Sequence, residues 1–232
     1  EKELAELLND VDNLKKLKGF ELPDDSEYKQ ILSCICNSID LGVEKIDCVE
    51  ATDTIPLLTS GGPAKTDVEI SLFSAGETFI ETISVKSSSK DKVSCHEYSA
   101  SDFIRVLGCK DTKLAEYINM FQKTPSYGSF KENLDATESE EEFTALMEPY
   151  ARRLTEWALT GEHDNEKLNY PTRQVSKYLF INSEERSVCY LMADYINHLF
   201  TETKNFKYGV PFSWTYSSRR RGKSIQLKVP LG

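Results

Sequence analysis

Hydrophobic residues repeat at helical spacing along the start of the chain and predict one amphipathic helix over about the first seventeen residues, ending at Gly19. A second helical pattern follows Pro23, with residues 24–26 as candidate N-caps. Its apolar stripe comprises Tyr28, Ile31, Leu32 and Ile35. Residues 45–50 alternate between polar and apolar side chains, which predicts a short strand after the two helices.

A glycine- and proline-containing break at residues 59–63 precedes two further segments with strand-like alternation, residues 67–73 and 78–86. Residues 74–77 separate these segments and predict a hairpin with a four-residue loop. Such a hairpin fixes which residues of the two strands lie opposite each other, from the loop to the end where the strands separate.

If the loop closes symmetrically, Asp67 lies directly opposite Ser84, and Lys86 follows one step further along the same face. A slip of one residue would move these side chains to different faces. The register therefore predicts that a carboxylate, a hydroxyl and an amine converge at one end of the hairpin.

Later segments add more helices and strands. Helices are expected at residues 101–107 and 112–122, and a longer helix opens with a capping-box sequence at 139–142, bends at Pro149 and ends at Gly161. The remaining elements are strands at 178–181 and 187–191, a helix at 193–200, and a C-terminal hairpin of 212–216 and 224–229. This mixture predicts an α/β fold, a mixed central β-sheet flanked by helices, in a single domain over residues 1–232.

Composition agrees with a globular protein, since 39% of residues are hydrophobic and 28% are charged. The sequence has no apolar segment of the roughly 20 residues that a membrane helix needs, and no leader-like start, so a cytoplasmic protein with no membrane association is expected. Its six cysteines lack metal-binding spacing and read as reduced thiols: Cys34, Cys36, Cys48, Cys95, Cys109 and Cys189.

The net charge of −10 argues against a nucleic-acid partner, but the charge is unevenly distributed. Residues 203–232 contain seven basic residues and neither Asp nor Glu. Arg219, Arg220 and Arg221 are suited to phosphates, and Gln226 and Lys228 to base edges in a DNA groove. The alternative is a solvated hairpin tip.

The hairpin residues have the chemistry needed for metal-assisted phosphodiester hydrolysis. Asp67 can bind Mg2+ through oxygen, and Lys86 can stabilise phosphate charge or hold the attacking water. The alternative is that both are ordinary exposed strand residues, paired across one face. Glu69 shares that face, either as a second metal ligand or as a solvated side chain.

Several motifs in order resemble the MspI family of type II restriction endonucleases: residues 60–67, 85–94, 148–150 before Trp157, and 214–218 with Gln226 and Lys228. The resemblance extends from about Glu27 to Lys228. It implies a variant of the PD-(D/E)XK nuclease fold. It also implies Mg2+-dependent double-strand cleavage of DNA at a short palindrome, with CCGG as the expected site.

Under this resemblance Asp67 matches the metal-binding aspartate and Lys86 the catalytic lysine. Ser84 departs from the family, because the wider superfamily has Asp or Glu at this position and this branch has an amide. Glu27 is a candidate auxiliary metal ligand. The residues expected near DNA are Ser94, Thr215, Ser218, Gln226 and Lys228 together with Arg219, Arg220 and Arg221, and Ser94, Gln226 and Lys228 are the expected base readers.

Two other functions stay open. The short, uncharged side chain of Ser84 suggests a sequence-specific DNA-binding protein that has a restriction-endonuclease fold and impaired cleavage. The net charge of −10 suggests an acidic interaction protein that does not bind DNA.

Overall fold

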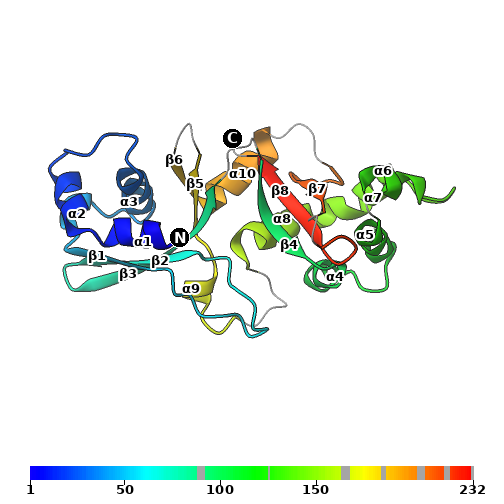
Figure 1. Ribbon diagram of the computed structural model, residues 1–232, viewed down its shortest axis with the longest axis horizontal. Helices are drawn as coiled ribbons and strands as arrows, with labels where there is room; N and C mark the ends of the chain where they lie inside the picture. The colour runs from blue at the N-terminus through cyan, green and yellow to red at the C-terminus, as the bar shows by residue number, and fades with distance from the viewer. Residues whose placement is uncertain are drawn as a thin grey trace. The chain divides into compact units, whose positions relative to one another are not determined.

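The computed structural model describes residues 1–87, 92–124, 126–162, 168–183, 187–202, 207–216 and 220–230. The chain divides into two compact units, drawn with the rest of the chain in Figure 1. Unit 1 comprises Glu1–Ser89 and Lys167–Tyr195, and unit 2 comprises Lys90–Glu166 and Ile196–Gly232. Whether the two units fold together as the single domain expected over residues 1–232 stays a prediction.

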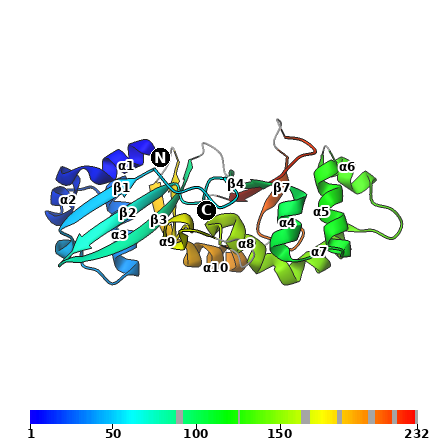
Figure 2. The same ribbon diagram turned by 90° about the horizontal axis from the view of Figure 1, so that it is seen from below.

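Unit 1 contains a five-stranded mixed sheet in the order β1-β2-β3-β5-β6. Strands β3 and β5 are parallel and every other neighbouring pair is antiparallel, which confirms the predicted mixed sheet. Figure 2 shows β1, β2 and β3 as neighbouring strands. The strands are β1 (Cys48–Thr52), β2 (Val68–Ser74), β3 (Glu77–Ser87), β5 (Tyr178–Asn182) and β6 (Ser187–Leu191).

The first fifty residues of unit 1 differ from the sequence prediction at two places, one in a helix and one in a strand. The single helix expected at the start is two helices, because Asp10 is extended (ψ 107°) and its side chain accepts a hydrogen bond from Asp12 N to cap the second helix. The strand expected at 45–50 begins later, since a 3-10 turn occupies its first residue. The helices are α1 (Lys2–Asn9), α2 (Val11–Lys18), α3 (Glu27–Ser38), η1 (Val43–Lys45) and α9 (Pro171–Gln174).

The unit 1 core lies between the sheet and the helices α1, α2 and α3, which Figure 1 shows on one side of the strands. Alternate β2 residues Val68, Ile70 and Leu72 are fully buried, and they pack with the predicted stripe of α3. Because side chains alternate along a strand, the opposite face of β2 carries Asp67 and Glu69. The core thereby directs the polar positions of the hairpin to one face.

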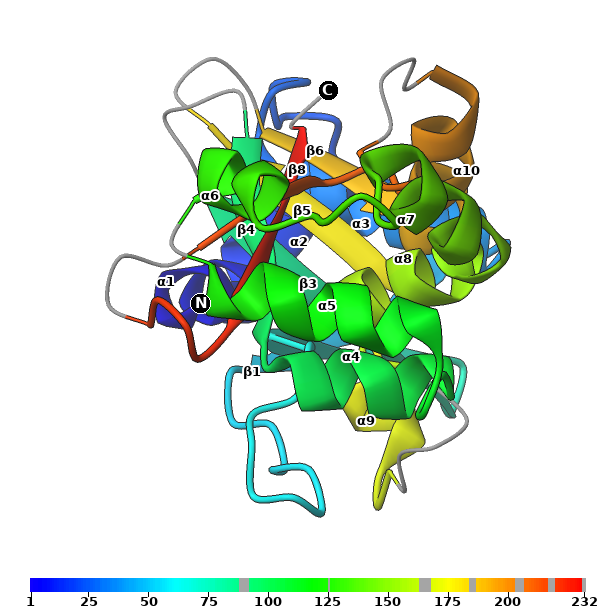
Figure 3. The same cartoon turned by 90° about the vertical axis from the view of Figure 1, so that its right-hand side faces the viewer.

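Unit 2 contains a three-stranded antiparallel sheet in the order β4-β8-β7, so the predicted C-terminal hairpin is confirmed. Its strands are β4 (Lys92–Tyr98), β7 (Ser213–Thr215) and β8 (Ile225–Pro230). Its helices are α4 (Ala100–Leu107), α5 (Lys113–Lys123), α6 (Tyr127–Glu132), α7 (Glu140–Met147), η2 (Glu148–Tyr150) and α8 (Ala151–Thr160), and the chain passes from unit 1 to unit 2 within α10 (Met192–Glu202). Figure 3 shows α4 and α5 next to each other.

The long helix predicted after Ser139 is confirmed with its bend, since η2 separates α7 from α8 and Gly161 ends α8 in a left-handed conformation (φ 81°). The predicted capping box is half formed. Ser139 accepts a hydrogen bond from Glu142 N, whereas the Glu142 carboxylate accepts one from the Tyr117 hydroxyl. The Glu142 carboxylate therefore joins α7 to α5 and does not complete the capping box.

An aromatic cluster fills the core of unit 2. Phe121 and Phe143 both contact the indole of Trp214, which anchors β7 to α5 and α7. On β8 the residues Ile225, Leu227 and Val229 are fully buried. The residues between them on β8, Gln226 and Lys228, therefore point away from this core.

Candidate active site

Strands β2 and β3 pair in the register that the sequence predicted. Val68 lies opposite Ile83, and Asp67 N donates to Ile83 O at 2.8 Å, which extends the pairing to Asp67 opposite Ser84. The predicted four-residue loop is wrong, because Ser74 and Glu77 are themselves paired. The turn consists of two residues, Ala75 and Gly76, both with positive φ (50° and 84°), as tight hairpins require.

The hairpin brings together the three side chains expected to carry the chemistry. Ser84 Oγ donates to Asp67 Oδ2 at 3.1 Å, and Lys86 Nζ lies 3.3 Å from the same oxygen. The backbone N–H of Val85 also donates to Asp67 Oδ2, at 2.6 Å. The position of the carboxylate is therefore fixed by three donors from β3.

The ammonium group of Lys86 lies among three oxygens. Its Nζ is 2.7 Å from Ser84 Oγ and 2.9 Å from Val85 O, in addition to Asp67 Oδ2. The side chains of Lys86 and Asp67 are only 17% and 21% exposed, so the cluster is largely screened from water. Oxygens gathered around one positive charge form a site that suits a cation.

A divalent metal fits this oxygen cluster. Asp67 Oδ1 receives no hydrogen bond from the residues that the structure describes, so it is available as a ligand. Among the described residues no group of three or more His, Cys, Asp or Glu side chains could hold a metal. Mg2+ is commonly bound by one or two carboxylates, with waters and substrate phosphate oxygens completing its coordination, so one carboxylate with neighbouring oxygens is sufficient.

A short helix that sequence reasoning missed, α9, holds the irregular segment before Asp67. Gln174 of α9 is buried, and its Nε2 donates to Pro56 O at 3.1 Å and to Leu57 O at 2.9 Å. Thr82 Oγ1 donates to Val175 O at 2.6 Å, which fixes the same segment to β3. Pro171 at the first turn is the one local signal that marks α9.

Glu69 is ion-paired and not solvated. It is 8% exposed, and its Oε2 accepts a hydrogen bond from Nε of Arg173 in α9. Sequence reasoning missed Arg173, because 104 residues separate it from its partner.

Glu27, the candidate auxiliary ligand, lies in the first turn of α3 and bonds to the β5–β6 strands. Its Oε1 accepts from Asn182 Nδ2 at 2.6 Å and from Ser187 Oγ at 3.4 Å. No hydrogen bond or ion pair in the described part of the chain joins Glu27 to Asp67 or Lys86. Its role toward a metal stays a prediction.

In unit 2 four of the expected DNA-contacting residues lie in the β4-β8-β7 sheet and share its outward face. Lys228 of β8 is paired with Ser94 of β4, and Gln226 is paired with Thr215 of β7. The β4 strand is not among the strands that the sequence predicted. Ser94 thus belongs to a sheet that presents hydroxyl, amide and ammonium groups in one surface.

The predicted basic tip is described in part. Ser218 and Arg219 lie outside the described residues. Arg220 and Arg221 are exposed, and Arg220 Nε lies 3.9 Å from Glu97 Oε1 on β4. Glu97, which also accepts from Ser224 Oγ at 2.9 Å, is an acidic residue on this surface that sequence reasoning missed.

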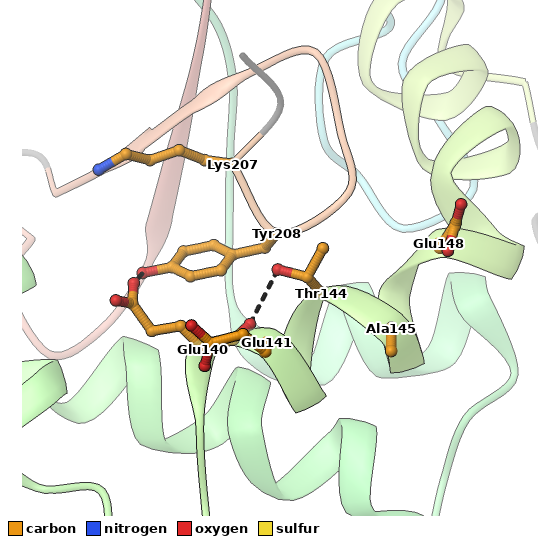
Figure 4. Close-up of a pocket in the computed structure, with 7 residues that line it drawn as sticks. All are labelled: Glu140, Glu141, Thr144, Ala145, Glu148, Lys207 and Tyr208. Atoms are coloured by element: carbon orange, nitrogen blue, oxygen red, sulfur yellow. Dashed lines mark hydrogen bonds between the residues drawn. The ribbon is translucent and has the colours of Figure 1, made fainter.

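Unit 2 also has a pocket on α7, shown in Figure 4. Tyr208 donates to Glu140 Oε1 at 3.3 Å, and Thr144 donates to Glu140 O at 2.8 Å. Three glutamates contribute to its lining, so its negative charge opposes phosphate binding. The lining residues are Glu140, Glu141, Thr144, Ala145, Glu148, Lys207 and Tyr208.

All six cysteines are free, as expected. Burial raises the pKa of Cys36 to about 11, so this thiol stays neutral near pH 7 and is a poor nucleophile. Among the described residues no helix is long and apolar enough to cross a membrane.

A mixed sheet that places an aspartate and a lysine side by side on a hairpin, followed by helices and a second sheet, defines a restriction-endonuclease fold. The solved structure of restriction endonuclease MspI in complex with its cognate DNA shares this fold with a TM-score of 0.77, at 23% identity over 98% of this chain and 86% of that chain. The family described as restriction endonuclease MspI matches residues 1–229, and the chain belongs to this family.

Two curated relatives carry the name of type II restriction enzymes. BsuFI of Bacillus subtilis is 32% identical over 237 residues, which cover 98% of this chain and 57% of BsuFI. MspI of Moraxella sp is 27% identical over 236 residues, which cover 98% of this chain and 87% of MspI. The chain thus spans little more than half the length of BsuFI.

Proposed function

We propose that this protein is a type II restriction endonuclease that hydrolyses phosphodiester bonds in both strands of DNA at a short palindromic site, and that it acts in the cytoplasm. The observation that carries the proposal is the convergence of Asp67, Ser84 and Lys86 on one hairpin face, in a chain of the MspI family. The curated relatives are named as type II restriction enzymes, which supports the same activity.

Mg2+ is the proposed cofactor. Asp67 would hold it through its carboxylate, with Ser84 Oγ and the Val85 carbonyl as the neighbouring oxygens. Such an ion supplies a Lewis acid and lowers the pKa of bound water. Glu27 is proposed as an auxiliary acidic residue on the resemblance alone.

Lys86 has the catalytic role in this proposal. Its three hydrogen bonds use all three ammonium donors, so Lys86 must release these oxygens before it can act on substrate. Once released, its positive charge can hold the attacking water and stabilise the charge that develops on the phosphate. The short distance from Asp67 keeps the amine within reach of the same phosphate.

Sequence reading is assigned to the outward face of the β4-β8-β7 sheet. Ser94, Gln226 and Lys228 are the proposed base readers, and Thr215 lies beside them. Ser218 is proposed as a DNA-contacting residue on the resemblance alone. Lysine suits the O6 and N7 acceptors of guanine, which agrees with CCGG as the proposed site. The phosphate contacts are assigned to Arg219, Arg220 and Arg221.

A second candidate function rests on Ser84. Its hydroxyl is shorter than the amide of the family and carries no charge, so it binds a cation more weakly, and the protein would bind specific DNA without cutting it. Replacing Ser84 with Asn or Asp distinguishes the two functions, because these substitutions would restore cutting only in a protein whose cleavage is impaired.

Digestion of a sequenced plasmid with and without Mg2+, followed by end mapping, tests the proposal. We expect discrete bands whose ends fall at CCGG and no cutting in EDTA. Discrete ends at another palindrome would refute CCGG as the recognition site but would still support the proposed endonuclease activity. Specific DNA binding without cutting in Mg2+ or Mn2+ would favour the second candidate function. The absence of any salt-dependent duplex binding would favour the acidic interaction protein instead.

A further inference from the structure

The face that carries Asp67 carries a second carboxylate. Glu69 lies opposite Thr82 in the register that places Asp67 opposite Ser84. Two positions along a strand are about 6.6 Å apart at Cα and share a face. Since two-metal sites hold their ions about 3.5–4 Å apart between neighbouring carboxylates, this spacing by itself is compatible with two cations.

A guanidinium group already occupies the Glu69 end of this face. Nε of Arg173 donates to Glu69 Oε2, and the two side chains are 33% and 11% exposed. An arginine keeps its charge at every accessible pH, so it cannot leave the carboxylate by losing a proton. Any second cation at Glu69 has to displace a permanent positive charge.

The backbone around Arg173 holds it in place. Gln174, the next residue, is buried and bonded to two carbonyl oxygens of residues 56–57, and the Val175 carbonyl accepts from Thr82. Arg173 belongs to the short helix α9, which contacts β3, and Figure 2 draws α9 near β3. Moving Arg173 away would leave the carboxylate of Glu69 without its charge partner in a place with little water, which is unfavourable.

We propose that Arg173 takes the place of a second metal ion, so that the active site holds one divalent cation, at Asp67. This inference rests on the proposed function, because it assumes a metal at Asp67. Arg173 is then a positioning residue: it neutralises Glu69 and leaves Asp67 as the sole carboxylate of the hairpin face that is open to a cation.

Lys177 and Glu81 provide a matched control. Lys177 Nζ lies 3.2 Å from Glu81 Oε2, so a lysine just after α9 makes an ion pair with β3, as Arg173 does with β2. Glu81 lies an odd number of positions from Ser84 and therefore on the opposite face of the strand. Lys177→Ala removes a cation from a buried glutamate without opening the face that carries Asp67.

The test counts Mn2+ ions per chain by electron paramagnetic resonance and titration calorimetry, with circular dichroism to confirm folding. We expect one ion in the parent protein, one in Glu69→Gln with a Kd within about twofold, and one in Lys177→Ala. Arg173→Ala should bind two ions. Arg173→Gln, which keeps a hydrogen-bonding side chain but has no charge, should also bind two ions. It replaces the alanine variant in the test if that variant does not fold.

Two ions in the parent protein and one in Glu69→Gln would overturn the inference, because Glu69 would then be a ligand. A folded Arg173 variant that still binds one ion would also overturn it. Failure of the proposed function looks different: the parent protein would bind no ion, or Asp67→Asn would bind as many ions as the parent.

Discussion

At the residue scale, the hydroxyl of Ser84 links the two charged groups of the candidate site. It donates to Asp67 Oδ2 and accepts from Lys86 Nζ, and the residue is 1% exposed. The net contribution of one such buried hydrogen bond to stability is about 1 kcal/mol. Ser84 is thus expected to hold the geometry of the pair as well as to take part in cation binding.

Ser84→Ala should lower the free energy of unfolding by about 1 kcal/mol and slow cleavage about fivefold, as expected from the same energy in the activation barrier. Denaturant unfolding and single-turnover cleavage measure the two effects. Ser71→Ala is the matched control, since Ser71 lies on the same face of β2, away from Asp67. Equal cleavage rates for the Ser84 variant and the parent would contradict the linking role.

The trio could be predicted because strand geometry is local and regular. A period of two and the symmetry of one hairpin place Asp67, Ser84 and Lys86 on one face without further information. Arg173 could not be predicted in the same way. Its contact with Glu69 spans 104 residues and depends on how a four-residue helix packs on the sheet.

At the element scale, Asp10 shows how a cap overrides periodicity. The leucines on both sides keep helical spacing, so the pattern predicts one helix, but the carboxylate of Asp10 bonds to Asp12 N and begins a second one. Losing such a cap costs about 1 kcal/mol.

We therefore expect Asp10→Ala to reduce the free energy of unfolding by about 1 kcal/mol in guanidinium titrations. Asp25→Ala removes the same charge from an exposed position just before α3 and should change stability by less than half as much. If both substitutions had the same small effect, the cap would not account for the break between α1 and α2.

Strand β4 escaped prediction for a different reason. Its pairing with β8 shifts between Ser94 and His96, and the consecutive residues Cys95 and His96 are both buried. A bulge of this kind breaks the alternation on which strand prediction depends. The C-terminal hairpin keeps its alternation in β8 and was predicted correctly.

Lys228, on the outward face of β8, provides a test of base reading. A good contact between a lysine and guanine contributes about 1–3 kcal/mol of discrimination. Lys228→Met should therefore reduce the preference for the cognate site over single-base variants by about 5- to 160-fold. Competition binding measures this preference, with Lys223→Met as control; an unchanged preference in the Lys228 variant would remove this residue from the reading set.

At the scale of the whole molecule, charge distribution matters more than net charge. The chain carries a net charge of −10, yet its last thirty residues have no acidic side chain. DNA binding through this segment should release counterions and weaken steeply with salt. The overall charge by itself argues against the DNA partner that we propose.

Replacing both Arg220 and Arg221 with Ala should lower the slope of log K against log salt by about 1.8. Lys15→Ala with Lys16→Ala changes the net charge equally from helix α2 and should leave the slope unchanged. The slope is measured by fluorescence anisotropy between about 50 and 200 mM salt, because protein–DNA binding weakens strongly over this range. Equal slopes for the two double variants would contradict the assignment of phosphate contacts to the basic tip.

The fold class and the family could be predicted from the sequence because motifs and elements occur in the expected order from Glu27 to Lys228. The division into two compact units could not, since residues 167–195 return to the first sheet after a long excursion. This return depends on contacts between segments that are distant in sequence, notably the pairing of β5 with β3, and no local sequence pattern predicts it.

The most direct test of the account is single-turnover cleavage of a mapped substrate by the parent protein and by Lys86→Ala, with DNA binding measured on the same samples. The account predicts equal binding and a loss of cleavage of about a hundredfold or more in the variant. Lys177→Ala, which removes a lysine from the opposite face, should cleave at the parent rate. Cleavage by Lys86→Ala at the parent rate would contradict the central claim that Asp67 and Lys86 form the active site.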